Sequence, residues 1–307
     1  DGNAEKAMAE SYTVSDDGLT YNFKLKQDRY WTDVNGYNKK VTAADFVFGF
    51  RRLFLPETRA PKASEYFCIK NSDKINSGEI TDLSQLGVTA QGDYSLTIEL
   101  QYTEPSFAML LAMPAAMPCN EEYFIKAQGK YGLDAERTAS NGPFYVKTWN
   151  YDAWSNNNNN LVLRYSDKYN EHDEVTPLGL NFFIDEANPK KDFTDGTIHS
   201  YVASGEEAAE LLSKGYEYTE NDNAVWGILF NTKSIFSDDN LRKALMLDVS
   251  RQFDNAVSGY SITSSMIPQA ISIVDSSYHE LAGDTGVKPD AKSAKKYYER
   301  AFEKSGS

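Results

Sequence analysis

Short segments in which apolar and polar residues alternate recur along this 307-residue chain, separated by stretches with helical periodicity. Alternation with a period of two predicts a strand that buries one face. Five segments show it, at Tyr21–Leu25, Leu96–Leu100, Phe144–Val146, Leu161–Tyr165 and Leu180–Ile184. Because helical patterns lie between these strands, we expect an α+β or α/β fold with several open sheets and no single closed barrel.

Helix signals fill the spaces between the strands. Thr42 and Asp45 resemble a capping box, the apolar residues from Phe46 to Phe54 recur at helical spacing, and Pro56 ends the pattern. Mixed sequence at Pro61–Ile80 predicts a helix that breaks at Gly78. Further helices are predicted at Phe107–Met113, Glu121–Gln128, Gly205–Lys214, Asn240–Leu245 and Asp290–Lys304.

Three other segments have a local sequence pattern that indicates their secondary structure. Residues Trp31–Lys40 are polar and contain glycine, which indicates a hairpin or a loop. The consecutive asparagines Asn156–Asn160 indicate the solvated tip of a hairpin. The apolar run from Trp226 to Asn231 predicts a buried strand.

Composition excludes several classes of protein. The net charge is −14, with 45 acidic against 31 basic residues, so the basic footprint of a nucleic-acid-binding protein is missing. No run approaches the roughly 18 to 20 apolar residues of a membrane span. The chain opens on Asp1 without a signal sequence and ends on Ser307, and we expect it to be a piece of a longer protein.

Histidines and cysteines are scattered. Cys68 and Cys119 lie far apart in the sequence and neither is near a histidine; buried free thiols are favoured over a disulfide. His172, His199 and His279 show no metal-ligand spacing, so no metal, cofactor or catalytic thiol is expected. No nucleophile motif or phosphate loop occurs either.

Blocks of sequence in a fixed order resemble the extracytoplasmic solute-binding proteins of oligopeptide ABC importers, bacterial extracellular solute-binding protein family 5, oligopeptide/dipeptide-binding type. Each block alone is explained by turns and caps, whereas together they extend along nearly the whole chain. The blocks are Ala7–Tyr12, Gly18–Leu25, Val41–Phe46, Asn141–Phe144, Asp195–His199, Trp226–Leu245 and Ala291–Gly306.

The resemblance implies a periplasmic-binding-protein-like fold of two lobes (type II) with an extra N-terminal β-rich domain, here truncated at both ends. Residues 1–118 would form the extra domain, 119–222 the middle part of the first lobe, and 223–307 the opening, incomplete part of the second lobe. Such a chain is expected to bind peptides weakly or not at all. It is also expected to self-associate through residues 223–307, because an uncovered apolar face favours association.

The implied function is that of the extracytoplasmic binding component of an importer. It would capture oligopeptides for delivery to an ABC permease in the cytoplasmic membrane, without catalysis, in the periplasm or as a lipoprotein at the cell surface. Two alternatives stay open. The 20 Tyr, 16 Phe and 4 Trp residues also suit an oligosaccharide-binding relative, and paired carboxylates in a cleft would suit a secreted hydrolase.

By resemblance, peptide recognition rests on main-chain hydrogen bonds with roomy side-chain pockets. Each implied contact residue also has an alternative interpretation without ligand. Met113 and Leu229 are of ordinary core residue types, and Lys62 is of an ordinary surface type. The predicted ligand-binding residues are Lys62, Tyr66, Met113, Val202, Ala203, Ser204, Trp226, Gly227 and Leu229.

Three positions depart from the family pattern. His199 replaces an acidic residue of the turn before the hinge, Ser250 replaces an aspartate near the end of a helix, and residues 32–40 form an expanded turn. These positions are structural in the family, so the resemblance implies a retained fold with an altered ligand preference.

Overall fold

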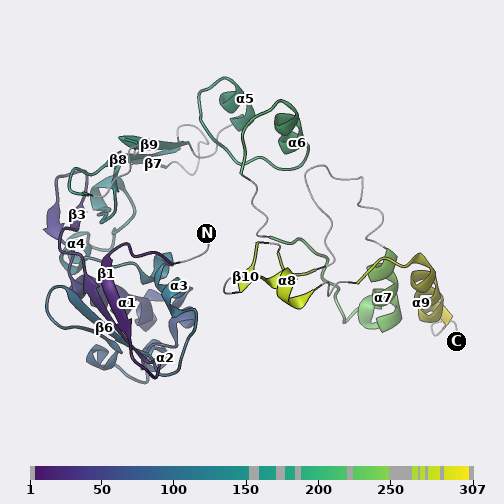
Figure 1. Ribbon diagram of the computed structural model, residues 1–307, viewed down its shortest axis with the longest axis horizontal. Coiled ribbons are helices and arrows are strands. Elements are labelled where there is room, and N and C mark those ends of the chain that lie inside the picture. Colours follow the sequence, from purple (N-terminus) through teal and green to yellow (C-terminus); the bar gives the residue numbers. More distant parts are fainter. Residues whose placement is uncertain are drawn as a thin grey trace. The chain divides into compact units, whose positions relative to one another are not determined.

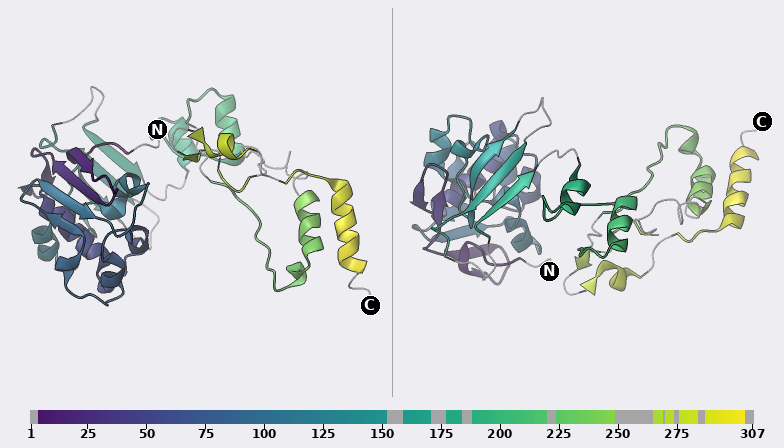
Figure 2. Two further views of the ribbon diagram at one scale, coloured as in Figure 1. Left: turned by 60° about the horizontal axis from the view of Figure 1, so that its bottom comes forward. Right: turned by 90° about the horizontal axis from the view of Figure 1, so that it is seen from above.

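The computed structural model describes residues 4–151, 159–170, 177–183, 188–219, 224–248, 265–268, 270–273, 276–283 and 287–303. Internal contacts divide the chain into two compact units, Asp1–Asn188 and Pro189–Ser307. Figures 1 and 2 show the elements of each unit, coloured along the sequence. The domain boundaries predicted after residues 118 and 222 come from the lobes of the family that the sequence resembles. The contact-based division does not test them, so they stay predictions.

The first unit is built on an antiparallel sheet of four strands with the order β1-β2-β6-β5. Tyr21 pairs with Ile98 and Phe23 with Leu96, so these four side chains lie on one face. Leu96 and Ile98 are buried, which confirms the predicted alternation. The strands are β1 (Ala9–Val14), β2 (Thr20–Leu25), β5 (Val88–Ala90) and β6 (Ser95–Glu99).

Helix α1 (Ala43–Phe54) covers this sheet face and packs on β5 and β6. Its capping box at Thr42 and Asp45 is present as predicted, and the helix ends before Pro56. Val47, Phe50, Leu53 and Phe54 are buried in one cluster with Leu25, Leu96 and Ile98. The main core of the first unit therefore lies between α1 and the sheet.

Short helices complete the first unit. The helix predicted within Pro61–Ile80 forms as two short pieces, because backbone turns interrupt the pattern; Gly78 has the left-handed φ of +80° that a turn after a helix requires. These elements are η2 (Ala63–Tyr66), α2 (Ser72–Asn76), α3 (Phe107–Leu111) and α4 (Glu121–Lys126). Other short 3₁₀ turns are η1 (Pro56–Thr58), η3 (Leu83–Gln85), η4 (Pro114–Ala116) and η5 (Ala135–Arg137).

A buried polar network joins three of these elements. The expanded turn at residues 32–40 belongs to a hairpin of β3 (Tyr30–Thr32) and β4 (Asn38–Lys40). The Asp45 carboxylate in α1 accepts hydrogen bonds from the Trp31 indole N–H at 3.1 Å and from the Asn120 amide at 2.9 Å. Asp45 and Trp31 are both buried, so this carboxylate ties the hairpin to α1 and to the start of α4.

A second antiparallel sheet has the order β7-β8-β9. It consists of β7 (Phe144–Asn150), β8 (Asn160–Tyr165) and β9 (Gly179–Phe183), which confirms three predicted strands. Ile184, predicted as the end of the last strand, lies outside the described residues, as do Asn156–Asn158 of the predicted hairpin tip, His172 and Ser250.

The second unit is mainly helical. Helices α7 (Asp239–Asp248) and α9 (Ala291–Glu303) lie side by side (Figure 2), and each has one buried alanine, Ala244 in α7 and Ala294 in α9. The helix predicted at Asn240–Leu245 is present as α7, and the Asp238 carboxylate caps its start by accepting the N–H groups of Asn240 and Leu241. Its elements are α5 (Pro189–Thr194), α6 (Gly205–Ser213), η6 (Ile235–Ser237), α7 (Asp239–Asp248), β10 (Ser272–Ile273), β11 (Ser276–Ser277), α8 (Tyr278–Ala282) and α9 (Ala291–Glu303).

One predicted element of the second unit is wrong. The run Trp226–Asn231 is not a buried strand: it has no regular secondary structure, and Trp226, Ile228 and Leu229 are 87%, 68% and 98% exposed. Among the described residues, no backbone hydrogen bond involves residues 224–230. A strand requires a hydrogen-bonded neighbour, and apolar sequence alone does not supply one.

Candidate functional site

Three predicted ligand residues lie in the first unit, on two segments that the fold brings together. Lys62 is exposed, precedes η2 and forms an ion pair with Glu65. Tyr66 at the end of η2 is fully buried, and its hydroxyl donates a 2.8 Å hydrogen bond to the Leu110 carbonyl of α3. Met113 follows α3 and is 46% exposed. The 62–66 segment is therefore docked against the helix that leads to Met113.

Tyr66 is held by the core. Its ring packs edge-on against Phe50 of α1, with ring centroids 6.2 Å apart. Burial raises the pKa of Tyr66, so the hydroxyl stays protonated and serves as a hydrogen-bond donor. In this structure the side chain positions α3, while Lys62 and Met113 are the accessible members of the predicted set.

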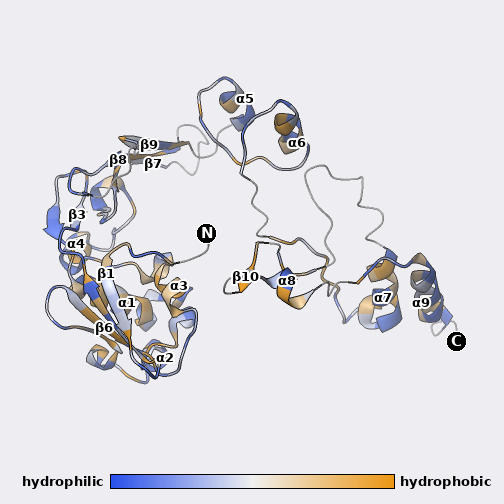
Figure 3. Ribbon diagram, in the orientation of Figure 1, coloured by the Kyte–Doolittle hydropathy of each residue, from blue (hydrophilic) through white to orange (hydrophobic). Residues whose placement is uncertain are grey.

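The segment that contains α3 also carries two methionines that the predicted set omits. Met109 and Met117 are 41% and 48% exposed, like Met113 between them. Figure 3 draws α3 in the colour of hydrophobic residues. Their spacing of four residues in the sequence could have singled them out, but the apolar composition of the segment suggested a buried helix instead.

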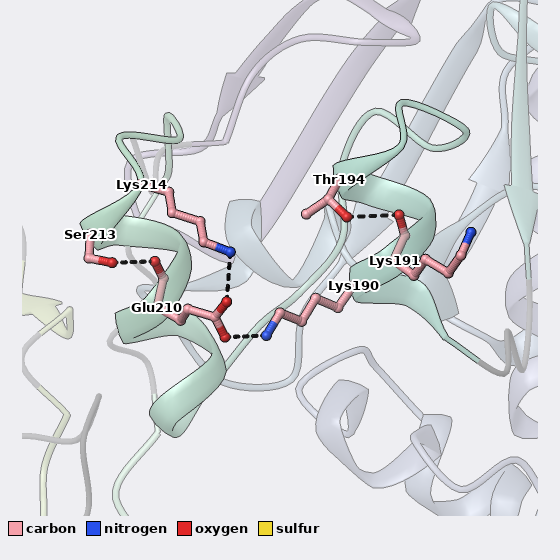
Figure 4. Close-up of polar contacts among 6 residues, drawn as sticks. All are labelled: Lys190, Lys191, Thr194, Glu210, Ser213 and Lys214. Carbon is pink, nitrogen blue, oxygen red and sulfur yellow. Dashed lines mark hydrogen bonds and ion pairs between the residues drawn. The ribbon is translucent and has the colours of Figure 1, made fainter.

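In the second unit, an ion-pair cluster joins α5 to α6. Figure 4 shows Lys190 of α5 and Lys214 after α6 contacting the two oxygens of Glu210, the latter at 2.7 Å. The hydrogen bonds from these two ammonium groups lower the pKa of Glu210 to about 2. Glu210 therefore stays ionised and links the two helices across the segment that connects them.

An aromatic cluster supports the same helix pair. The Phe193 ring of α5 lies 5.2 Å from the Tyr201 ring and 5.0 Å from the Tyr216 ring, centroid to centroid. Leu211 of α6 is buried. Tyr201 thereby fixes the start of the predicted ligand segment 202–204 relative to α5.

The predicted ligand residues of the second unit lie on exposed chain. Val202 is 96% exposed, Ala203 is partly exposed, and Ser204 is exposed just before α6. This stretch has no regular secondary structure. The other three residues, Trp226, Gly227 and Leu229, belong to the exposed run described above, and a Cβ at Gly227 would meet no atom within 4 Å beyond its chain neighbours.

The cysteines and the metal-ligating side chain types of the described residues have defined positions in the structure. The part of the chain that the structure describes contains no group of three His, Cys, Asp or Glu side chains able to hold a metal ion. Cys68 and Cys119 are both buried and free, as predicted. Burial raises the pKa of Cys68 to about 11 and raises that of Cys119 as well. Both thiols are therefore protonated at neutral pH and poor nucleophiles.

The first unit has a shallow depression of about 540 Å³. Its lining residues are charged or polar in type apart from one tyrosine, and none of them belongs to the predicted ligand set. The lining residues are Glu10, Lys24, Lys26, Gln27, Asp28 and Tyr30. Within the described ranges, no helix combines the length and the apolar character needed to cross a membrane.

Comparison with known proteins identifies relatives of this chain. A dipeptide-binding protein of Lactococcus lactis is 34% identical over 183 residues, which cover 60% of this chain and 32% of the relative. The substrate-binding domain of an oligopeptide ABC transporter from Bacillus anthracis is 30% identical with a TM-score of 0.72; the match covers 98% of this chain and 58% of that one. OppA of Listeria monocytogenes, solved bound to peptide, is 26% identical with a TM-score of 0.77, covering 99% and 60%.

This chain thus spans about a third of the curated relative's length and about three fifths of the solved chains. The likeness to these solved structures confirms the predicted mixed α/β fold of the periplasmic-binding-protein type. The family model described as bacterial extracellular solute-binding proteins, family 5 Middle, matches residues 3–307. The chain therefore belongs to the bacterial extracellular solute-binding proteins of family 5.

Proposed function

We propose that this chain is part of the extracytoplasmic binding component of an ABC importer that captures oligopeptides and performs no catalysis. The observation that carries the proposal is the family match over residues 3–307, together with relatives named for binding dipeptides and oligopeptides. The protonated, buried thiols are consistent with binding rather than chemistry.

The proposed ligand contacts fall in both units. In the first unit Lys62 offers a charge and Met113 an apolar side chain, while Tyr66 positions α3. In the second unit, no backbone hydrogen bond within the described part of the chain uses the N–H groups of residues 202–204 and 226–229, which leaves them available to an extended peptide. Main-chain hydrogen bonding of this kind gives affinity with little dependence on the peptide sequence.

The proposal extends to location and partners. A binding component of this family would act outside the cytoplasm, in the periplasm or at the cell surface as a lipoprotein. It would deliver its ligand to ABC permease subunits in the cytoplasmic membrane. The supporting observation is the family itself, whose description is that of extracellular solute-binding proteins.

Calorimetry with a peptide mixture, compared with cello- and malto-oligosaccharides, tests the proposal. We expect peptide binding to be weak or absent, with a dissociation constant no lower than about 1 mM, which corresponds to a binding free energy no stronger than roughly −4 kcal/mol. Binding of the oligosaccharides in preference to peptides would favour the alternative suggested by the aromatic content and by the exposed Trp226. Turnover of a peptide or glycoside substrate would instead show a hydrolase.

Self-association through residues 223–307 is a further part of the proposal. Its support is the exposed apolar run 224–230, which carries no charge, although the whole chain has a net charge of −14. Exposed, uncharged segments with high strand propensity favour pairing between chains.

A further inference from the structure

Two asparagines of this chain are followed directly by glycine, in the pairs Asn35–Gly36 and Asn141–Gly142. Asparagine is a chemically labile residue. A following glycine makes it more so, because glycine has no Cβ to keep its backbone nitrogen away from the asparagine side chain. The sequence does not distinguish the two pairs, whereas their surroundings in the first unit differ.

The chemistry at such a pair is the loss of the side-chain amide. The glycine nitrogen bonds to the side-chain carbonyl carbon of the asparagine, and the side-chain nitrogen leaves as ammonia with the proton of the glycine N–H. Water then opens the cyclic imide at either carbonyl, which gives aspartate or isoaspartate. The reaction therefore requires an asparagine side chain that is free to turn and a glycine N–H that is not bonded elsewhere.

Both requirements fail at Asn35. Its side-chain NH₂ donates to the Asp33 carboxylate at 3.4 Å and to the Glu136 carbonyl at 3.3 Å. The backbone N–H groups of Asn35 and Tyr37 donate to the other oxygen of the same carboxylate at 2.8 and 2.7 Å. The Gly36 N–H donates to the Asp33 carbonyl at 3.4 Å. The turn therefore holds both reacting groups away from each other.

Both requirements are met at Asn141. Among the described residues, none forms a hydrogen bond with the Asn141 side chain or with the Gly142 N–H. Both residues are partly exposed, so water can reach the pair. A Cβ at Gly142 would meet no atom within 4 Å beyond its chain neighbours, so the space beside the reacting nitrogen is open.

The residues on either side of the second pair are anchored. The Ser140 N–H donates to the Thr32 carbonyl at 2.8 Å, and the Thr32 N–H donates to the Ser140 carbonyl at 2.7 Å. The Pro143 carbonyl accepts the Ser166 N–H at 2.8 Å. Isoaspartate at position 141 would lengthen the backbone by one carbon between these anchors and add a negative charge where the chain enters β7.

We propose that Asn141 is a site of spontaneous deamidation in the folded protein, through a cyclic imide with Gly142, and that its turn protects Asn35. The proposal concerns a covalent modification of the chain and is independent of the proposed function.

Peptide mapping by mass spectrometry measures both sites in one sample, after incubation of the chain in mildly alkaline buffer. In the native chain we expect Asn35 to deamidate at least about ten-fold more slowly than Asn141, because hydrogen bonds of its turn must open first. In urea the two rates should agree within about two-fold, since both asparagines then precede a glycine in an unfolded chain. The unfolded sample thus separates the effect of the structure from that of the sequence.

Gly142→Ala tests the role of the glycine nitrogen without disturbing the fold. The φ angle of Gly142 lies outside the left-handed region, and the space for a Cβ is empty, so alanine fits. We expect this variant to deamidate at Asn141 at least about ten-fold more slowly, because the added Cβ crowds the attacking nitrogen. Gly227→Ala, at another glycine with the same two properties, is the matched control and should leave both rates unchanged.

Three results would overturn the proposal. The first is equal deamidation of the two asparagines in the native chain, or faster deamidation of Asn35. The second is a native chain that deamidates at neither site although the unfolded chain deamidates at both. The third is a Gly142→Ala variant, shown to be folded by circular dichroism, that deamidates at Asn141 as fast as the natural chain.

Discussion

The buried carboxylate of Asp45 offers the sharpest test of how the first unit is held together. It accepts the Trp31 indole N–H and the Thr42 backbone N–H on one oxygen and the Asn120 amide on the other. The substitution D45N keeps the size and shape of the side chain but leaves one oxygen and one NH₂ group. Because Asn120 uses its own oxygen to accept from Tyr37 and from the Tyr123 N–H, it is not free to turn over.

The expected cost follows from these contacts. The NH₂ group of D45N would face the NH₂ group of Asn120, so one buried bond is lost and a donor is left unpaired, at about 1–3 kcal/mol. The other two bonds change from charge-assisted to neutral and lose roughly half their strength. A total of about 3 kcal/mol would lower the melting temperature by about 6–12 °C for a unit of this size.

Urea denaturation followed by circular dichroism measures this cost. Asp167→Asn is the matched control, because the Asp167 side chain is 86% exposed and the change should alter stability by less than about 0.5 kcal/mol. The double variant D45N/N120D restores a donor–acceptor pair and should recover at least about 1 kcal/mol. A D45N chain as stable as the natural one, or no recovery in the double variant, would refute the reasoning.

Three further predictions concern other parts of the chain. The folded-state pKa of Glu210 is lowered from its ordinary value of 4.5 to about 2. The contribution of Glu210 to stability is therefore complete above about pH 4.5 and is lost as the pH falls toward about 2. Glu210→Gln should remove this part of the pH dependence of the free energy of unfolding. Sedimentation velocity should show self-association of the natural chain that Leu229→Lys abolishes and Leu281→Lys, at another exposed leucine, leaves intact; equal sedimentation of all three would contradict the role of the 224–230 run. A thiol reagent should label neither Cys68 nor Cys119 in the native chain and both after unfolding, and rapid native labelling would contradict their burial.

Local sequence signals were sufficient to predict much of the secondary structure of the first unit. The alternation at Tyr21–Leu25 and the capping box at Thr42 and Asp45 depend on neighbouring residues, so the sequence predicts them directly. The same holds for the start of α7, where Asp238 caps the N–H groups that follow it.

Contacts between distant residues explain what the sequence left undetermined. The resemblance implies that Tyr66 contacts ligand, but Tyr66 is buried, and Leu110, whose carbonyl accepts the hydrogen bond from its hydroxyl, is 44 residues away. The Lys190–Glu210 pair spans 20 residues, and neither pattern nor spacing predicts it. The run at 226–231 has the composition of a buried strand, yet burial depends on a partner strand that composition does not specify.

Hydrogen–deuterium exchange of the 307-residue chain, measured with and without millimolar peptide, tests the central claim most directly. The amides of residues 202–204 and 226–229 lie on chain without regular secondary structure, so an extended peptide that bonds to them should slow their exchange. The account predicts this protection, together with protection around Lys62 and Met113, for peptides and not for malto-oligosaccharides. Unchanged exchange at all four places in the presence of the peptide, or protection by the oligosaccharide alone, would contradict it.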